Sequence, residues 1–208
     1  MDVFVFPLAH VVFYPSISKP FHVFEPRYVQ MVRDAIAQNK SIAIGYVDDP
    51  TQQYQFFPGQ KLDFVRDIVG FGAPLIMEEK PEGGLIVFLQ GVGKLRLGPV
   101  LDVPVPYIVC QADLIAENLT LLQSSVGDIQ TIQKMVLSWV NEHVSEKRNR
   151  DQFLQLLQSP NEIIGCFVSY LLSDRDIQQL ILEEDDINQK IKIIMSLILS
   201  GKADLLPS

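Results

Sequence analysis

Histidine and cysteine side chains could catalyse a reaction or bind a metal, and this sequence holds few of them. They are His10, His22, His143, Cys110 and Cys166. No two of them lie at the short spacing that zinc ligands show, and the His-Glu-x-x-His motif is absent. A nucleophile would have to be assembled from distant residues, such as Cys110 with His22, and no sequence pattern supports that pairing. The sequence therefore predicts no catalytic residue and no metal ligand. It favours two buried, inert thiols over a disulfide or a nucleophile.

Motifs that bind phosphate groups or divalent ions are also missing or weak. The sequence has no Gly-x-x-x-x-Gly-Lys-Ser/Thr loop, and Gly91-Val92-Gly93 falls inside a β pattern rather than between a strand and a helix. Paired acids occur at 48–49, 78–79 and 183–186, in expected turns or at helix ends. Solvated acids and helix caps are the simpler interpretation, and a divalent-ion site is the alternative. We expect no cofactor.

Composition narrows the class of protein. The chain has 208 residues, 48% of them hydrophobic and 20% charged, which is typical of a folded soluble protein with a real core. Its net charge of −8 repels a phosphate backbone, so nucleic acid is an unlikely partner. No segment offers about 18 uninterrupted apolar residues, as a membrane span needs, and Pro7 cuts short the N-terminal apolar run, which lacks basic residues. We expect a cytoplasmic protein with no membrane partner.

The first forty residues predict strand, turn, strand and helix. Residues 3–6 are β-favouring and Pro7 is expected to end that strand, while 21–24 form a second short strand. Pro26 suits the first position of a helix, and Asn39 with Lys40 suits its end. One apolar face of this helix is expected to hold Tyr28, Met31, Val32, Ala35 and Ile36.

The remainder of the first half is expected to be β structure punctuated by glycine. Strands are predicted at 41–47, 62–77 and 85–89, with a hairpin turn at 78–84. Gly70 and Gly72, and again Gly91 and Gly93, indicate bulges or bends of a curled sheet. The last β stretch, 100–112, contains Pro104 and Pro106, which place its start at a sheet edge or a bulge.

Near residue 115 the pattern becomes helical. One helix is predicted around 129–144, with Trp139 as a core residue or a ligand platform, followed by a charged turn at 146–151 and a short helix at 153–157. Ser159-Pro160-Asn161-Glu162 is a strong helix start, and the final helix runs over 187–198 toward Gly201. The chain therefore divides into a β-rich part, 1–115, and a helical part, 116–208.

Several motifs of the first part resemble one family. They are Phe6-Pro7-Leu8, Pro15, and the run Phe24-Glu25-Pro26-Arg27-Tyr28. Together they look like the signature of the Lon protease N-terminal, substrate-binding domain. Weaker matches continue at Val69-Gly70, Gly83-Gly84, 91–97, Pro106-Tyr107 and 176–183. Tyr14 and Lys94 depart from the family pattern, which often has Phe and usually has Arg at these places.

The resemblance implies an α+β fold, with a PUA-like β pseudo-barrel and an early crossover helix followed by a C-terminal helical bundle. The ATPase and Ser–Lys protease modules of the full-length protease have no counterpart in this sequence. The chain therefore resembles the stand-alone, non-catalytic form of the domain.

A protein of this kind is expected to bind unfolded or exposed apolar polypeptide segments, as an adaptor or decoy with a protease as a further partner. The alternatives are a PUA-like pocket for a small ligand or RNA and, less favoured, an enzyme that uses Cys110 or Cys166. The signature residues are expected to be mainly structural, and Arg27→Ala to lower stability more than peptide binding. We place the candidate peptide contact on an edge strand at Val103, Val105 and Tyr107.

Overall fold

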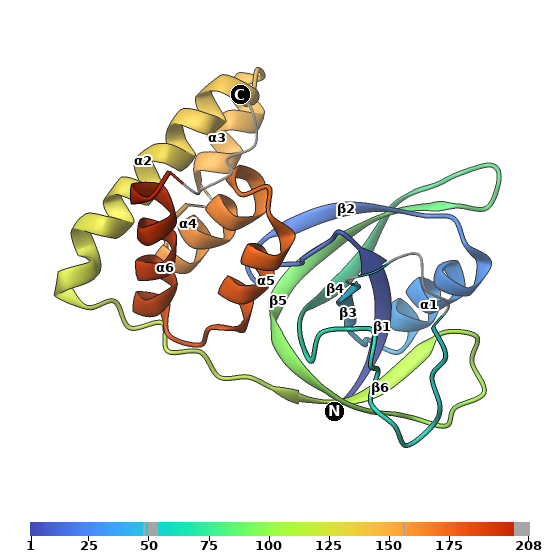
Figure 1. Cartoon of the computed structure of the whole chain (residues 1–208). Coiled ribbons are helices and arrows are strands. Elements are labelled where there is room, and N and C mark those ends of the chain that lie inside the picture. Colours follow the sequence, from blue (N-terminus) through green and yellow to red (C-terminus); the bar gives the residue numbers. More distant parts are fainter. Residues whose placement is uncertain (48, 50–53, 156, 202–208) are drawn as a thin grey trace. The chain divides into compact units, whose positions relative to one another are not determined.

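The computed structural model describes residues 1–47, 49, 54–155 and 157–201. The chain divides into two compact units, Met1–Ile115 and Ala116–Ser208, which we call the β unit and the helical unit (Figure 1). No helix in the described part of the chain is long and apolar enough to cross a membrane.

Six strands form the sheet of the β unit. They are β1 (Asp2–Ala9), β2 (Ser18–Val23), β3 (Ile42–Val47), β4 (Ile68–Glu79), β5 (Leu85–Val100) and β6 (Ile108–Leu114). Their order is β2-β5-β4-β3-β1-β6, and β5 also pairs with β6, so five strands close a ring while β2 lies outside it. Only β1 and β3 are parallel among these pairs. Figure 1 shows β4 and β5 curving around the interior, which confirms the expected pseudo-barrel.

Glycines allow the sheet to curl where the sequence predicts it. The register between β4 and β5 shifts between Phe71 and Gly72, opposite Gly91 and Gly93. A Cβ atom on Gly72 would lie 2.1 Å from the carbonyl oxygen of Gln90, so the two backbones approach too closely for a side chain. The expected bulge is therefore confirmed.

Several of the expected boundaries were wrong. The strand expected at 62–77 spans Ile68–Glu79, and the one expected at 21–24 spans Ser18–Val23. β1 continues through Pro7 to Ala9, because beyond Val5 it pairs, among the described strands, with β3 alone, so the missing N–H of Pro7 disrupts no ladder on the other side. β5 is one strand of 16 residues, because its glycines bend it without ending it. The last strand begins at Ile108 rather than at 100.

Helix α1 (Pro26–Ala37) follows β2 directly and begins, as expected, with Pro26 at its first position. Its buried side chains are Tyr28, Met31, Val32 and Ala35. Ile36 is 44% exposed, so its expected place on the buried face was wrong. Asn39 has a φ of 50°, and the N–H of Lys40 donates to the carbonyl of Ala35 at 2.8 Å, which is the hydrogen bonding of a Schellman end.

Two hydrophobic clusters lie on the two faces of β1 and β3. One draws on all five strands of the ring and fills the barrel interior, with Val5, Val69 and Leu95 among its members. The other packs α1 and β2 against Phe4, Phe6 and the first half of β5. β1 therefore contributes to both clusters. One of its faces lines the barrel interior, and the other packs against α1.

The helical unit has five α-helices in its described part. They are α2 (Val126–His143), α3 (Lys147–Gln155), α4 (Pro160–Cys166), α5 (Arg175–Glu183) and α6 (Ile187–Leu199), with a π-helical turn over Phe167–Leu171. The capping box of Ser159 and Glu162 is present as predicted. The charged turn expected at 146–151 was wrong, because α3 begins at Lys147.

The first residues of the helical unit form hydrogen bonds with the N-terminal part of α6 and the residue before it. Asn118 forms a parallel bridge with Asp186 and donates its side-chain amide to that carboxylate at 2.6 Å. The buried ammonium of Lys190 donates to the carboxylate of Glu117. These contacts lie within the helical unit and fix the segment that precedes α2.

Candidate functional site

Phe24 is a large apolar side chain that points into solvent. It lies between the end of β2 and the start of α1, and its side chain is 71% exposed. The alternation of β2 turns Val23 into the core and Phe24 outward, and Pro26 begins the helix before the chain can turn Phe24 inward. The abrupt change from strand to helix therefore fixes an aromatic ring at the surface.

Two hollows border Phe24. The first, of about 320 Å³, lies between the ends of β1 and β2, the first turn of α1 and Tyr54. The second, of about 400 Å³, follows α1 from Pro26 to Asp34 and reaches Glu82 on the β4–β5 hairpin. Because Phe24 lines both, it forms a ridge between them. We call this surface the Phe24 site.

Aromatic rings form the wall of the first hollow, and the cation of Arg27, which is paired with Glu25, lies over one of them. The rings of Phe6 and Tyr28 lie 4.4 Å apart, and the guanidinium of Arg27 lies 4.5 Å above the ring of Tyr28. Arg27 Nε donates to Glu25 Oε2 at 2.9 Å. Burial raises the pKa of Tyr28, and the nearby charge of Arg27 offsets only part of that rise. Tyr28 therefore stays neutral and acts as an apolar wall.

A second group of exposed apolar side chains lies on the outward face of β2, β5 and β4. Phe88 pairs with Pro20 on one side and with Leu75 on the other, in one row across three strands. Leu75 is 61% exposed and Phe88 37%. The register shift between Ile76 and Glu78 leaves Met77 as an extra residue, 58% exposed. We call these residues with Ile86 the outer apolar face.

His22 connects this face to the Phe24 site. It pairs with Ile86 across the sheet, and its ring lies 6.2 Å from that of Phe24 in an edge-on arrangement. Cross-strand neighbours lie about 5 Å apart, so the two apolar surfaces adjoin at the hairpin end of β2. Adjoining apolar surfaces of this kind are candidate contact areas for a partner.

Most residues of the motifs that resemble the Lon domain lie at this site. Seven of these nine residues line the first hollow, namely Phe6, Pro7, Leu8, Phe24, Glu25, Arg27 and Tyr28. Pro26 lines the second hollow, while Pro15 is buried in the connection between β1 and β2. Phe6 and Tyr28 belong to the core, whereas Phe24 does not. The sequence alone does not show this division, because nothing in it reveals the hollows.

The residues expected on an edge strand lie in a loop instead. Val103, Val105 and Tyr107 precede β6, and Pro104 and Pro106 deprive this segment of the N–H groups that a ladder needs. The strand assignment was therefore wrong. The three residues do line a small hollow of about 110 Å³. The strand that lies at the end of the sheet order is β2, which pairs, within the described residues, with β5 alone.

Tyr107 has a structural role in that loop. Its hydroxyl donates to Asp34 Oδ2 at 2.7 Å, and its ring lies 4.9 Å from that of Phe4. Burial, and then the hydrogen bond with Asp34, raise the pKa of Tyr107. A buried side chain with a satisfied hydroxyl offers little surface to a peptide.

The thiols and acids form no reactive cluster in the described part of the chain. Cys110 and Cys166 are buried and free, and burial raises the pKa of each to about 12. The carboxylate of Asp186 accepts from the N–H groups of Asn188 and Gln189, so it caps α6 as the sequence predicts. No group of three metal-ligating side chains is found among the described residues.

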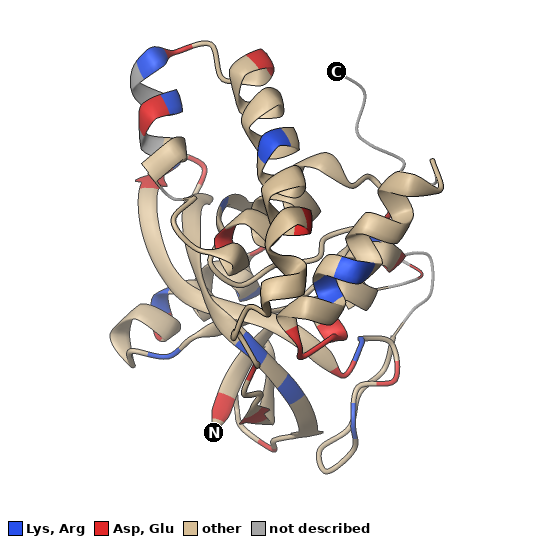
Figure 2. Ribbon diagram, turned by 90° about the vertical axis from the view of Figure 1, so that its left-hand side faces the viewer, with Lys and Arg blue, Asp and Glu red and all other residues tan. Residues whose placement is uncertain are grey.

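Charge of both signs is spread along the chain. Figure 2 shows Lys and Arg interspersed with Asp and Glu on the ribbon rather than collected on one element. With a net charge of −8, this distribution does not favour a phosphate backbone. The chain connection from β3 to β4 lines an open hollow of about 680 Å³, with Tyr54, Phe64, Lys61 and Arg66 among its residues.

Known proteins share this fold. Residues 2–200 match the family model of the ATP-dependent protease La (LON) substrate-binding domain. A Lon N-terminal domain protein from Xanthomonas campestris is 17% identical with a TM-score of 0.63, and the match covers 94% of this chain and 98% of that one. The N-terminal domain of the Mycobacterium avium complex Lon protease is 12% identical with a TM-score of 0.69, covering 94% and 97%. No curated protein sequence matches this chain. Because the family model spans nearly the whole chain, this protein belongs to the family of Lon substrate-binding domains.

Proposed function

We propose that the β unit binds exposed apolar segments of unfolded polypeptides at the Phe24 site. The observation that carries this proposal is the position of Phe24, a ring that is 71% exposed between two hollows. Burying apolar surface stabilises a complex by about 25 cal/mol per Å², so an exposed aromatic ridge is an effective anchor. Membership in a family of substrate-binding domains supports a polypeptide as the ligand.

The outer apolar face extends the contact area. An unfolded segment that inserts a side chain beside Phe24 can lay its next apolar residues over His22, Phe88 and Leu75. Among the described strands β2 pairs with β5 alone, so its other edge can offer backbone groups to an extended peptide, although Pro20 has no N–H. We infer a site that selects apolar character and extended conformation rather than one sequence.

Binding is tested with a fluorescently labelled apolar peptide and with a reduced, unfolded protein, followed by anisotropy. We expect Phe24→Ser to weaken binding about tenfold or more, the loss typical of removing an interface anchor. Leu180→Ser is the matched control, because Leu180 is similarly exposed but lies on α5 of the helical unit. Circular dichroism and thermal melting must show both variants folded.

Two outcomes would reject the proposal. One is equal affinity of the wild-type protein and folded Phe24→Ser for both probes. The other is an equal loss of affinity in Leu180→Ser, which would indicate non-specific association of apolar surfaces.

We further propose that the bound segment is presented to, or withheld from, a protease. The test adds this protein to an ATP-dependent protease degrading an unfolded reporter that the protein binds. Faster degradation identifies an adaptor and slower degradation a decoy. An unchanged rate at saturating concentrations of this protein rejects both roles.

A further inference from the structure

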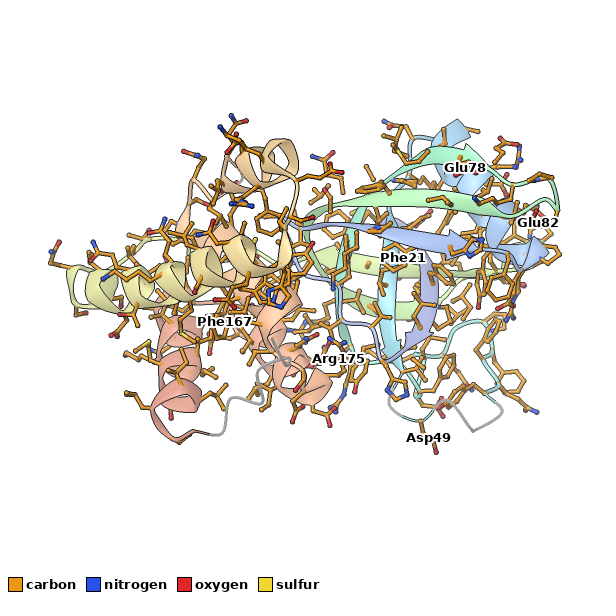
Figure 3. The ribbon with its side chains drawn as sticks, turned by 90° about the horizontal axis from the view of Figure 1, so that it is seen from above. Phe21, Asp49, Glu78, Glu82, Phe167 and Arg175 are labelled. Carbon is orange, nitrogen blue, oxygen red and sulfur yellow. The ribbon has the colours of Figure 1, made fainter. Side chains whose placement is uncertain are left out.

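Two carboxylates and the guanidinium of Arg33 line the second hollow at the Phe24 site. Glu82 lies at the tip of the β4–β5 hairpin and Asp34 in the third turn of α1, and both line this hollow. Glu78 and Glu79 end β4 beside them. Figure 3 shows Glu78 and Glu82 at the end of the hairpin, in the region of α1. The apolar part of the hollow is formed by Phe24, Pro26 and Val29.

The basic residues of this region are already paired. Arg33 Nη2 lies 2.9 Å from Glu79 Oε2, and Lys80 Nζ lies 2.7 Å from Glu78 Oε1. Asp34 accepts from the neutral hydroxyl of Tyr107. Arg33 lines the hollow but is paired with Glu79, which does not line it. No ion pair found among the described residues therefore offsets the charges of Glu82 and Asp34.

The helix dipole does not cancel this charge. The positive end of α1 acts over its first turn, where Glu25 occupies the N-cap position without a side-chain capping hydrogen bond. Asp34 lies in the last turns of α1, where the dipole is negative. The hollow therefore becomes more negative from Phe24 toward Asp34 and Glu82.

We propose that the second hollow selects apolar polypeptide segments that carry Lys or Arg next to the apolar residues. This inference rests on the proposed function of the Phe24 site and adds the charge of the preferred ligand. An apolar side chain packs against Phe24 and Val29 while the neighbouring cation reaches Glu82 and Asp34. Segments flanked by Asp or Glu are repelled by the same carboxylates.

The experiment compares three labelled peptides with one apolar core and with Lys, Gln or Glu flanks. At low salt we expect the wild-type full chain to bind them in that order, with about three- to fivefold between neighbours, as exposed charge pairs allow. Salt at about 0.5 M should reduce the differences in affinity among the three peptides, because the charges are exposed to solvent. Glu82→Lys should reduce or reverse the order.

Asp113→Lys is the control for net charge, because it makes the same change of charge as Glu82→Lys. Asp113 is an exposed carboxylate on β6 and lines neither hollow, so this variant should keep the full order of affinities. Equal binding of the three peptides by the wild-type protein would overturn the charge preference and leave the proposed function standing. Binding of none of them would overturn both. An unchanged order in Glu82→Lys would overturn the assignment to this hollow.

Discussion

Phe24 and Tyr28 belong to one five-residue motif, yet their side chains lie in opposite environments. Tyr28 packs against Phe6 in the core beneath α1, while Phe24 is largely exposed. Both are aromatic, and their types alone indicate core residues. The difference arises because β2 has ended at Val23 and α1 has not completed a turn.

This contrast predicts losses of stability of very different size. We expect Tyr28→Ala to lower the free energy of unfolding by about 3 kcal/mol, because it leaves a cavity under α1. Phe24→Ala should lower it by less than about 0.5 kcal/mol, because the ring is mostly in water. Urea unfolding followed by circular dichroism measures both. Similar losses in the two variants would contradict the placement of Phe24 at the surface.

Arg27→Ala should cost little stability. Its partner Glu25 is 45% exposed and Arg27 itself 50%, and exposed ion pairs contribute about 0–1 kcal/mol. Loss of the contact over Tyr28 adds about 0.5 kcal/mol. We expect a total near 1 kcal/mol in urea unfolding and a smaller change in peptide affinity. Lost peptide binding at unchanged stability would show that Arg27 is a contact residue.

At the scale of elements, glycine, proline and capping residues allowed much of the fold to be predicted. The start of α1 at Pro26, the bulge at Gly72 and the capping box at Ser159 follow from local chemistry and were correct. Elements decided by tertiary contacts were missed, among them the continuation of β1 through Pro7 and the loop before β6. The Phe24 site was missed for the same reason. Its walls come from β1, β2, α1 and the hairpin, which meet only after folding.

At Gly70 the sheet packs closely against the backbone of Phe13. A Cβ atom there would lie 1.8 Å from the carbonyl oxygen of Phe13, and backbone cannot move aside easily. We expect Gly70→Ala to destabilise the β unit by more than about 2 kcal/mol. Gly127→Ala is the control, because a Cβ on Gly127 in α2 meets nothing within 4 Å. That change should stabilise by up to about 1 kcal/mol. The opposite ranking in thermal melting would contradict the close approach.

The buried pair of Lys190 and Glu117 holds the first segment of the helical unit to α6. Removing one partner of a buried pair leaves an uncompensated charge and costs about 3–5 kcal/mol. We expect that loss in Lys190→Met, and partial recovery when Glu117→Gln is added. Lys192→Met, at an exposed position of the same helix, should change stability by less than about 0.5 kcal/mol. Equal effects at the two lysines would show that the pair of Lys190 and Glu117 contributes nothing to stability.

At the scale of the whole molecule, each unit buries one free thiol. Cys110 lies in β6 of the β unit and Cys166 ends α4 of the helical unit. Burial, with a smaller contribution from Glu162 at Cys166, raises both pKa values from 9.0 to about 12. A protected thiol reacts with a thiol reagent only when its surroundings open, because the thiolate is the nucleophile. The two thiols therefore report separately on the two units.

The raised thiol pKa values also predict how stability depends on pH. Between about pH 9 and 12 the thiols ionise in the unfolded chain but stay protonated in the folded one. The stability that the protonated thiols contribute to the folded state is therefore complete below pH 9 and is lost as the pH rises toward 12. We expect the urea midpoint to fall between pH 8 and 11, and to fall less steeply in Cys110→Ala/Cys166→Ala. An identical slope in that variant would show that other groups, such as Tyr107, govern the decline.

We propose that the β unit and the helical unit are separate folding domains, and the same thiols test this. Cys166→Ala leaves Cys110 as the probe of the β unit, and Cys110→Ala leaves Cys166 as the probe of the helical unit. The rate of labelling is measured against urea concentration in each variant. Because both hydrophobic clusters described for the β unit consist of residues of that unit alone, we expect two opening curves with different midpoints, and Gly70→Ala should shift the curve of Cys110 far more than that of Cys166. Coincident curves that shift together would show one cooperative unit, since the opening of either part would then require the opening of both.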